Sequence, residues 1–148
     1  MGDSDIEQWV NTVVLPDSYN LGVGGATCAD VMTWLDSSLS LLSPSRVVLV
    51  CGENDLGDFT VAQTFANFQR IVKRSVETGV QKVVYMSTKP EPDTVEYHLQ
   101  YRQYDQLILQ YARALPSRQL AFVDSYNGFL AVGNGGALYQ DDGLHLSS

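Results

Sequence analysis

Three short apolar runs, set well apart along the chain, constrain its fold more than any other feature of the sequence. They are Arg46–Cys51 (RVVLVC), Lys82–Ser87 (KVVYMS) and Leu120–Asp124 (LAFVD). Near-continuous apolar runs of this length, rich in valine, are typical of strands covered on both faces, as in a parallel sheet. The strand pattern before residue 25 is weaker, with two candidate segments, Thr12–Leu15 and Ser18–Leu21.

The segments between these runs have the periodicity of amphipathic helices. One helix is expected to begin at Thr60, which forms a capping-box pattern with Gln63, and to end at Gly79. Another is predicted from Thr27 to about Leu42, with its apolar residues on one face.

A further helix is expected from the similar pair Asp93 and Glu96 up to Pro116. Its apolar stripe consists of Tyr97, Tyr101, Tyr104, Ile108, Tyr111 and Leu115. A stripe at this spacing is typical of a core face rather than of a substrate platform. Strands that alternate with helices predict a single domain over residues 1–148, a three-layer α/β/α sandwich with a mainly parallel sheet and right-handed crossovers.

The charge of the chain excludes several classes of partner. Its 148 residues include 9 basic and 17 acidic side chains, giving a net charge of −8, which repels phosphate backbones and anionic lipid surfaces. We therefore expect neither a nucleic acid nor a membrane partner. No apolar run approaches the roughly 20 residues that a bilayer span needs. The start, MGDSDIEQWV, lacks the basic region of a signal peptide, which predicts a soluble, cytoplasmic chain.

The cysteines and histidines show no metal-binding pattern. Cys28 and Cys51 match neither a CxxC nor a Cys/His spacing, and a domain of this size does not depend on a disulfide. Both are predicted to be buried free thiols. His98 and His145 are the two histidines, and no HExxH or similar spacing includes them. The sequence therefore predicts no metal and no cofactor.

Four polar or glycine-rich segments stand where loops of an α/β sheet bind ligands, beyond the carboxyl ends of strands. They are Gly2–Ser4, Gly22–Thr27, Gly52–Asp55 and Asp142–His145. Each segment taken singly is typical of an ordinary turn. The second segment does not complete the GxGxxG fingerprint of dinucleotide-binding proteins, because Thr27 stands at the third glycine position.

Taken together and in this order, the four segments resemble the motif blocks of the SGNH hydrolases, also called the GDSL esterase and lipase family. Longer stretches are similar as well, namely GDSDIEQW, YNLGVGGATCADV, VVYMSTKPEP and DDGLHLS. The resemblance spans residues 2–145. It implies a flavodoxin-like fold and a serine hydrolase that cleaves carboxylic esters through an acyl-enzyme, with a small-molecule ester as its partner.

The resemblance implies a catalytic role for three residues. Ser4 is the expected nucleophile, His145 the base that takes its proton, and Asp142 the carboxylate that orients the imidazole. Asp141 is the alternative to Asp142. The other histidine, His98, is expected on the solvent side of its helix.

The resemblance also implies an oxyanion hole, the set of donors that meets the negative charge on the carbonyl oxygen. Its members are the backbone N–H of Ser4, the backbone N–H of Gly25 and the side-chain amide of Asn54. Gly24 is the alternative to Gly25.

The chain departs from the family pattern at both ends. The family's nucleophile follows an interior strand, and its histidine precedes a helix. In this sequence only Met1 and Gly2 precede Asp3 of the GDS block, and three residues follow His145. We therefore expect a sheet that lacks the first strand and the last helix, with unpaired edges that favour self-association. An inactive or fragmentary domain that acts as a non-catalytic binding protein is the alternative. Short connections favour short acyl chains, such as acetyl or butyryl esters, including acetylated sugars.

Overall fold

Three parallel strands form the sheet in a computed structural model that describes residues 1–115, 119–133 and 135–147. They are β1 (Arg46–Leu49), β2 (Lys82–Met86) and β3 (Leu120–Val123), hydrogen-bonded in the order β1-β2-β3. Each strand begins at the residue that the apolar runs predicted, so all three predicted strands are confirmed.

The register of the sheet places alternate side chains in the core. Val83 of β2 lies between Val47 of β1 and Leu120 of β3, and all three are buried. Two residues further along, Leu49 of β1 pairs with Tyr85 of β2. Both side chains point to the same face of the sheet as Val83 and are also buried. The alternation follows from the pleat, because successive side chains of a strand point to opposite faces.

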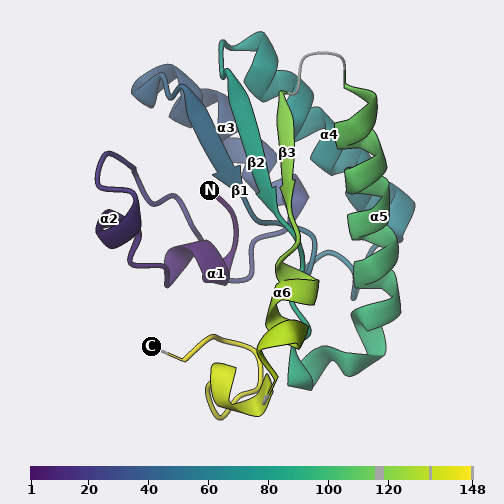
Figure 1. Cartoon of the computed structure of the whole chain (residues 1–148). Coiled ribbons are helices and arrows are strands. Elements are labelled where there is room, and N and C mark those ends of the chain that lie inside the picture. The colour runs from purple at the N-terminus through teal and green to yellow at the C-terminus, as the bar shows by residue number, and fades with distance from the viewer. Residues whose placement is uncertain (116–118, 134, 148) are drawn as a thin grey trace.

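Three long helices cover one face of the sheet (Figure 1). They are α3 (Cys28–Leu42), α4 (Val61–Glu77) and α5 (His98–Ala114), with α4 packed between the other two. Capping boxes begin α3 and α4, where Thr27 and Thr60 accept hydrogen bonds from backbone N–H groups of the first turn. Both helices are confirmed. No helix within the described ranges is long and apolar enough to cross a membrane.

The start of α5 differs from the prediction. Asp93 and Glu96 do not cap an α-helix, because the 3-10 helix η1 (Pro92–Tyr97) comes first and α5 begins at His98. Thr94 has a φ of −119°, outside the helical region, so the chain kinks within η1. A local capping pattern therefore predicted a helix in this part of the chain but not its first residue.

The tyrosine stripe of α5 is confirmed as a core face. Tyr104 and Ile108 are fully buried. The Tyr104 ring lies edge-on to Phe68 of α4 and to Tyr85 of β2, with ring centroids 6.2 and 6.1 Å apart, the preferred geometry for aromatic pairs. Pro116, the predicted end of this helix, lies outside the described residues.

The first two residues occupy the position next to β1 in the sheet. Gly2 forms parallel bridges to Gly22 on one side and to Val50 on the other. The Val50 N–H donates to the Met1 carbonyl (3.2 Å), and the Val23 N–H donates to the Gly2 carbonyl (2.9 Å). The parallel order is therefore the segment around Gly22, then Met1 and Gly2, then β1, β2 and β3.

This order creates a switch point, where neighbouring connections leave the sheet on opposite sides. The chain leaves Gly2 through α1 (Ser4–Glu7) in front of the sheet and leaves the segment around Gly22 through α3 behind it (Figure 1). Ligands of open α/β sheets bind at such points. The arrangement is that of a flavodoxin-like fold, and the predicted fold class is confirmed.

The two strand candidates of the N-terminal region are wrong. Thr12–Leu15 overlaps α2 (Asn11–Val14), and Ser18–Leu21 is not a strand, although the carbonyl of its last residue, Leu21, accepts the Gly2 N–H (3.4 Å). The Asn20 side chain donates to the Ile6 carbonyl in α1 (2.5 Å). This bond holds the chain after α2 against α1.

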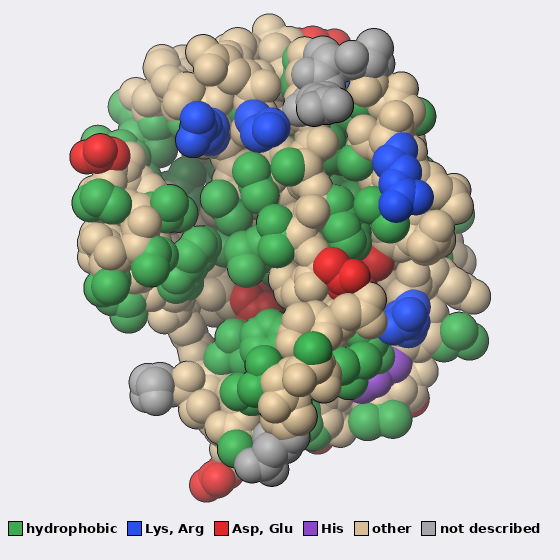
Figure 2. Space-filling model, viewed as in Figure 1, with side chains coloured by type: hydrophobic (Ala, Val, Ile, Leu, Met, Phe, Trp, Pro, Cys, Tyr) green, Lys and Arg blue, Asp and Glu red, His purple; other side chains and the backbone are tan. Residues whose placement is uncertain are grey.

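Two elements that the sequence did not predict follow β3. They are α6 (Ser125–Val132) and η2 (Gly135–Leu138). Asp124 caps α6 by accepting the Asn127 N–H (3.1 Å). Figure 2 shows hydrophobic side chains gathered in front of the strands, between α2 and α6. Val123, which is 44% exposed, belongs to this uncovered face.

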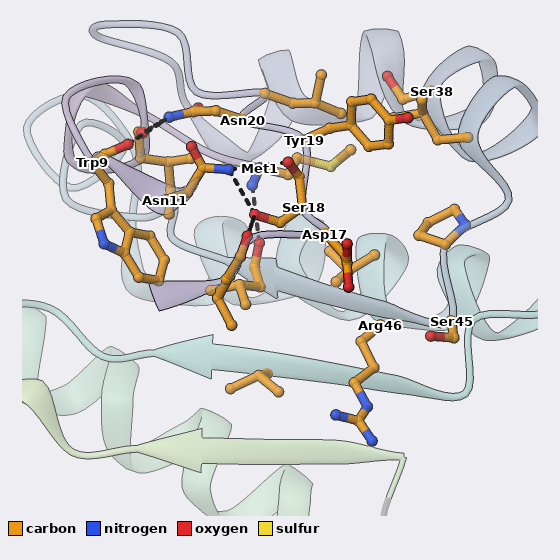
Figure 3. A pocket seen from close by; sticks show the side chains of 18 of the residues that line it. Met1, Trp9, Asn11, Asp17, Ser18, Tyr19, Asn20, Ser38, Ser45 and Arg46 are labelled. Carbon is orange, nitrogen blue, oxygen red and sulfur yellow. Dashed lines mark hydrogen bonds between the residues drawn. The ribbon is translucent and has the colours of Figure 1, made fainter. Parts of the chain in front are cut away.

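A cavity of about 640 Å³ lies beside β1, and none of the four motif segments lines it. Figure 3 shows β1 along one side, with Ser18 and Tyr19 on the other. Met1 closes one end, where its amine donates to the Val48 carbonyl (3.0 Å). In a parallel ladder the next groups on this edge are the Val48 N–H and the Arg46 carbonyl. A strand running upstream from Met1 would pair with these groups.

An extended, valine-rich segment of about five residues added before Met1 should fill this cavity and continue the ladder. We expect Tm to rise by about 5 °C or more and any self-association through the open edge to decrease. Thermal melts and size-exclusion chromatography with light scattering measure both effects. A glycine-serine extension of the same length is the control, and equal Tm values for the two extensions would contradict the expectation.

Candidate active site

A paired carboxylate and imidazole lie in the C-terminal loop. His145 Nδ1 is 2.7 Å from Asp142 Oδ2, and Asp142 Oδ1 accepts the backbone N–H groups of Leu144 (2.9 Å) and His145 (3.0 Å). The His145 side chain first, and then these two N–H groups, lower the pKa of Asp142 to about 2. With Nδ1 held by the carboxylate, Nε2 is the nitrogen left for proton transfer.

Ser4 is the first residue of α1, a helix capped by Asp3. The Asp3 side chain accepts the Asp5 N–H (3.1 Å). As the first helical residue, Ser4 has a backbone N–H with no preceding carbonyl of the helix to bind. Within the described part of the chain, neither Ser4 Oγ nor His145 Nε2 has a hydrogen-bond partner, so the two do not meet directly.

The C-terminal loop nevertheless packs against the segment that carries Ser4. Gln140 Nε2 donates to Gln8 Oε1, at the end of α1 (3.3 Å). Burial raises the pKa of Asp5, the residue after Ser4, and Lys89 opposes this rise. Catalytic hydrogen bonds are often formed only when substrate is bound, and this placement allows one.

Gly25 and Asn54 lie side by side in the second and third segments. A turn closed by the Ala26 N–H on the Val23 carbonyl (3.0 Å) places Gly25 at a φ of +72°, a region that favours glycine. Asn54 Nδ2 donates to the Ala26 carbonyl (3.2 Å). This bond uses one amide hydrogen of Asn54 and leaves the other for a ligand. Gly24 is not among the residues with positive φ.

Cys28 and Cys51 form a disulfide, so the prediction of two free thiols is wrong. Their Cα atoms are 5.2 Å apart across 23 residues of sequence. Asp55 Oδ2 accepts the Cys28 N–H beside this link (2.9 Å). The crossover through α3 brings the start of that helix to the end of β1, which sequence spacing alone did not show. Disulfides are rare in cytosolic proteins, so this one does not support the predicted cytoplasmic location.

The alternative histidine and aspartate have other surroundings. His98 is half-buried, with Nε2 at 2.9 Å from the Glu91 carbonyl and Nδ1 at 3.1 Å from the Tyr126 hydroxyl. Its predicted place on the solvent side is wrong, because His98 begins α5 next to η1 and α6. Both of its nitrogens are engaged. Asp141 is exposed, and Asp142 is the carboxylate that binds His145.

The sequence profile of the GDSL-like lipase/acylhydrolase family matches residues 7–148. The chain belongs to this family. The match begins after Ser4, so it does not cover that residue. Among proteins of curated function, none matches the sequence. Membership of the family makes the chain a hydrolase and supports ester hydrolysis in general.

Solved structures share the fold of this GDSL-like chain. A proposed acylhydrolase from Bacteroides fragilis is 26% identical, with a TM-score of 0.81 over 100% of this chain and 77% of that protein. A lipase/acylhydrolase from Enterococcus faecalis is 20% identical, with a TM-score of 0.80 over 99% of this chain and 85% of that one. A catalytic mutant of an acetylxylan esterase from Geobacillus stearothermophilus is 19% identical, with a TM-score of 0.73 over 93% and 69%.

A buried lysine beside the GDS segment was missed by the sequence analysis. The Lys89 side chain is 5% exposed, and its Nζ lies 3.0 Å from Asp5 Oδ2, 3.0 Å from Glu53 Oε2 and in contact with Glu91. These four residues are called the Lys89 cluster below. The signal in the sequence was a charged pair, Lys89 and Glu91, directly after β2. In the described residues no group of His, Cys, Asp and Glu side chains is arranged to hold a metal ion.

Burial dominates the electrostatics around Ser4. It raises the pKa of Asp3 to about 7 and the pKa of Asp5 and of Glu53 above their ordinary values, and Lys89 opposes each rise. Burial also opposes the charge of Lys89, but Glu53, Asp5 and Glu91 hold its pKa above the ordinary value. The ammonium therefore stays protonated while the carboxylates share its charge.

Asp105 of α5 anchors the loop that carries Lys89. Its carboxylate accepts the Thr88 hydroxyl (2.7 Å), the Thr88 N–H (3.3 Å) and the Tyr85 hydroxyl (3.0 Å). Burial raises its pKa to about 6, although these hydrogen bonds act in the opposite direction. Burial raises the pKa of Asp55 to about 6 in the same way.

The raised pKa of Asp105 predicts how stability depends on pH. Between about pH 4 and pH 6 the folded carboxyl holds a proton that the unfolded one releases, so its contribution to the free energy of unfolding falls as pH rises. Asp105→Asn should remove about 2 kcal/mol of that fall between pH 4.5 and 8. Urea unfolding of both proteins from pH 4.5 to 8 tests this, and parallel pH curves would contradict it.

Removing the disulfide should destabilise the site loops. We expect the double variant Cys28→Ala/Cys51→Ala to lose about 3 kcal/mol of unfolding free energy, because the link closes a loop of this size. Urea unfolding measures the loss, and unfolding of the wild type with and without reductant is the matched comparison. Equal stability of all three samples would show that the two sulfurs are not joined in the native protein.

Proposed function

We propose that this GDSL-like chain is a serine esterase that hydrolyses short-chain carboxylic esters through an acyl-enzyme on Ser4. The observation that carries the proposal is the bond between Asp142 and His145 (2.7 Å) in a loop that packs on the end of α1. A carboxylate-bound imidazole is the base that a serine hydroxyl needs. Ser4 belongs to the GDS block at the switch point of the sheet.

In the proposed reaction, His145 Nε2 takes the proton of Ser4 Oγ as this oxygen bonds to the ester carbonyl carbon. The C=O electron pair moves onto the oxygen. When the tetrahedral intermediate collapses, the bond to the alcohol oxygen breaks and the imidazolium gives its proton to that oxygen. Water then attacks the acyl group on Ser4 with His145 again as base; the bond between the acyl carbon and Ser4 Oγ breaks, the imidazolium returns its proton to Oγ, and the acid leaves. Asp142 stabilises the imidazolium in both halves.

The proposed oxyanion hole consists of the Ser4 N–H, the Gly25 N–H and the Asn54 amide. Asn54 is oriented by its bond to the Ala26 carbonyl (3.2 Å), and the disulfide holds the same two segments together. Each donor of this kind contributes about 3 kcal/mol when negative charge develops. The donors come from loops that follow three neighbouring strand positions of the sheet.

Acetyl and butyryl esters, including acetylated sugars, are the proposed substrates. An acetylxylan esterase shares the fold, and the net charge of −8 favours neutral esters over anionic ones. The Asp142 side chain is 46% exposed and that of His145 25%, which suits a shallow site open to a bulky alcohol group. A domain without activity that only binds such esters is the competing outcome of the experiment below.

Labelling with a fluorophosphonate, with the adduct mapped by mass spectrometry, tests the proposal directly. We expect one adduct, on Ser4, that is absent from Ser4→Ala and from His145→Ala. Ser40→Ala, on an exposed position of α3, is the matched control. Asn54→Ala should lower kcat on p-nitrophenyl acetate by roughly 10²–10³ with little change in KM. An adduct on another residue, or none on the folded wild type, would overturn the assignment.

A further inference from the structure

Three carboxylates surround the Lys89 ammonium, which donates hydrogen bonds to Glu53 and Glu91 and forms an ion pair with Asp5. Asp5 comes from α1, Glu53 from the loop after β1, and Glu91 from the loop that carries Lys89 itself. The lysine side chain is 5% exposed. A buried ammonium enclosed by carboxylates is not presented to a substrate, so we expect any effect of Lys89 on the reaction to act through the carboxylates that it contacts.

Two of these carboxylates are sequence neighbours of the proposed catalytic groups. Asp5 follows Ser4 directly, and Glu53 directly precedes Asn54. Glu53 is bound twice, because its Oε1 also accepts the backbone N–H of Lys89 (2.6 Å). The ammonium thus joins the segment of the nucleophile to the segment of an oxyanion donor.

The same loop also reaches the loop of the proposed base. The Asp93 N–H, a few residues after Lys89, donates to the Gly143 carbonyl (3.2 Å). Gly143 follows Asp142 and lies two residues before His145. Segments that are far apart in the sequence are therefore connected through one short stretch of chain.

We propose that Lys89 is a positioning residue that fixes the first turn of α1, and with it Ser4, against the loop that carries Asn54. The inference rests on the proposed function, because it requires Ser4 to be the nucleophile. Helix α1 has four residues, too few for its own hydrogen bonds to hold it in place. Displacement of a reacting group by about 1 Å can cost about 10²-fold in rate.

Substitution of Asp5 separates this role from a general effect on stability. Lys89→Met would leave buried carboxylates without a cation and could unfold the chain. Asp5→Ala removes only the bond to α1, and it leaves Lys89 paired with Glu53 and Glu91. Asp5→Asn removes the same charge as Asp5→Ala but keeps a side-chain oxygen facing Lys89 Nζ. The pair of variants therefore isolates the contact from the charge.

We expect Asp5→Ala to lower kcat by about 10-fold or more with KM changed less than about 2-fold, and Asp5→Asn to restore most of the loss. Tm of Asp5→Ala should not fall, because carboxylates outnumber the ammonium in the Lys89 cluster. The Gln8 N–H, which donates to the Ser4 carbonyl (2.9 Å), should exchange with solvent about 5-fold faster in Asp5→Ala. Glu7→Gln removes a charge from an exposed position of the same helix and is the control.

The outcomes separate this inference from the proposed function. Wild-type kcat in Asp5→Ala would overturn the positioning role, and so would equal losses in Asp5→Ala and Asp5→Asn, which would assign the effect to charge. If the wild type is not labelled on Ser4, the proposed function is wrong. Hydrogen exchange at Gln8 then still reports whether Lys89 holds α1, and unchanged exchange would overturn that contact as well.

Discussion

The parallel pairing of Gly2 between Gly22 and Val50 is the constraint on which the remaining structure depends. It places the start of the chain inside the sheet rather than at an edge. Because the connection from Gly2 runs in front of the sheet while those from its two neighbours run behind it, the carboxyl ends of the strands open into a crevice. The GDS segment, the glycine turn and the loop after β1 all begin there, so residues far apart in sequence share one surface.

Backbone pairing joins the first two site segments, because Gly2 bridges to Gly22 and the Val23 N–H donates to the Gly2 carbonyl. Side-chain links join the third segment to them. The disulfide and the bond from Asn54 to the Ala26 carbonyl join the second and third segments, and Lys89 joins the third segment to α1. These links lie in a buried setting, where a hydrogen bond to a charged group contributes more than it does in water. Burial at the same place raises the pKa values of the Asp3 and Glu53 carboxyl groups, which opposes their ionisation.

The parts of the structure that depend on local pattern were predictable. The three strands and the helices that begin at Thr27 and Thr60 follow from runs and capping pairs within a few residues, and the Asp142–His145 pair spans only three. Local pattern failed in the N-terminal region, where a β-branched run forms α2 and Asn20 bonds back to α1. The disulfide and the Lys89 cluster were missed because both join segments brought together only by the crossovers. The roles of Ser4, Gly25 and Asn54 stay predictions from resemblance.

The amine of Met1 is a member of the sheet, because it donates to the Val48 carbonyl (3.0 Å). Burial lowers its pKa to about 6, although Asp3 acts in the opposite direction. An amide N–H would make the same hydrogen bond without a charge that burial opposes. A residue joined to this nitrogen would supply such an amide and make Met1 an ordinary ladder residue, so the hydrogen-bond pattern of the sheet can continue through this position.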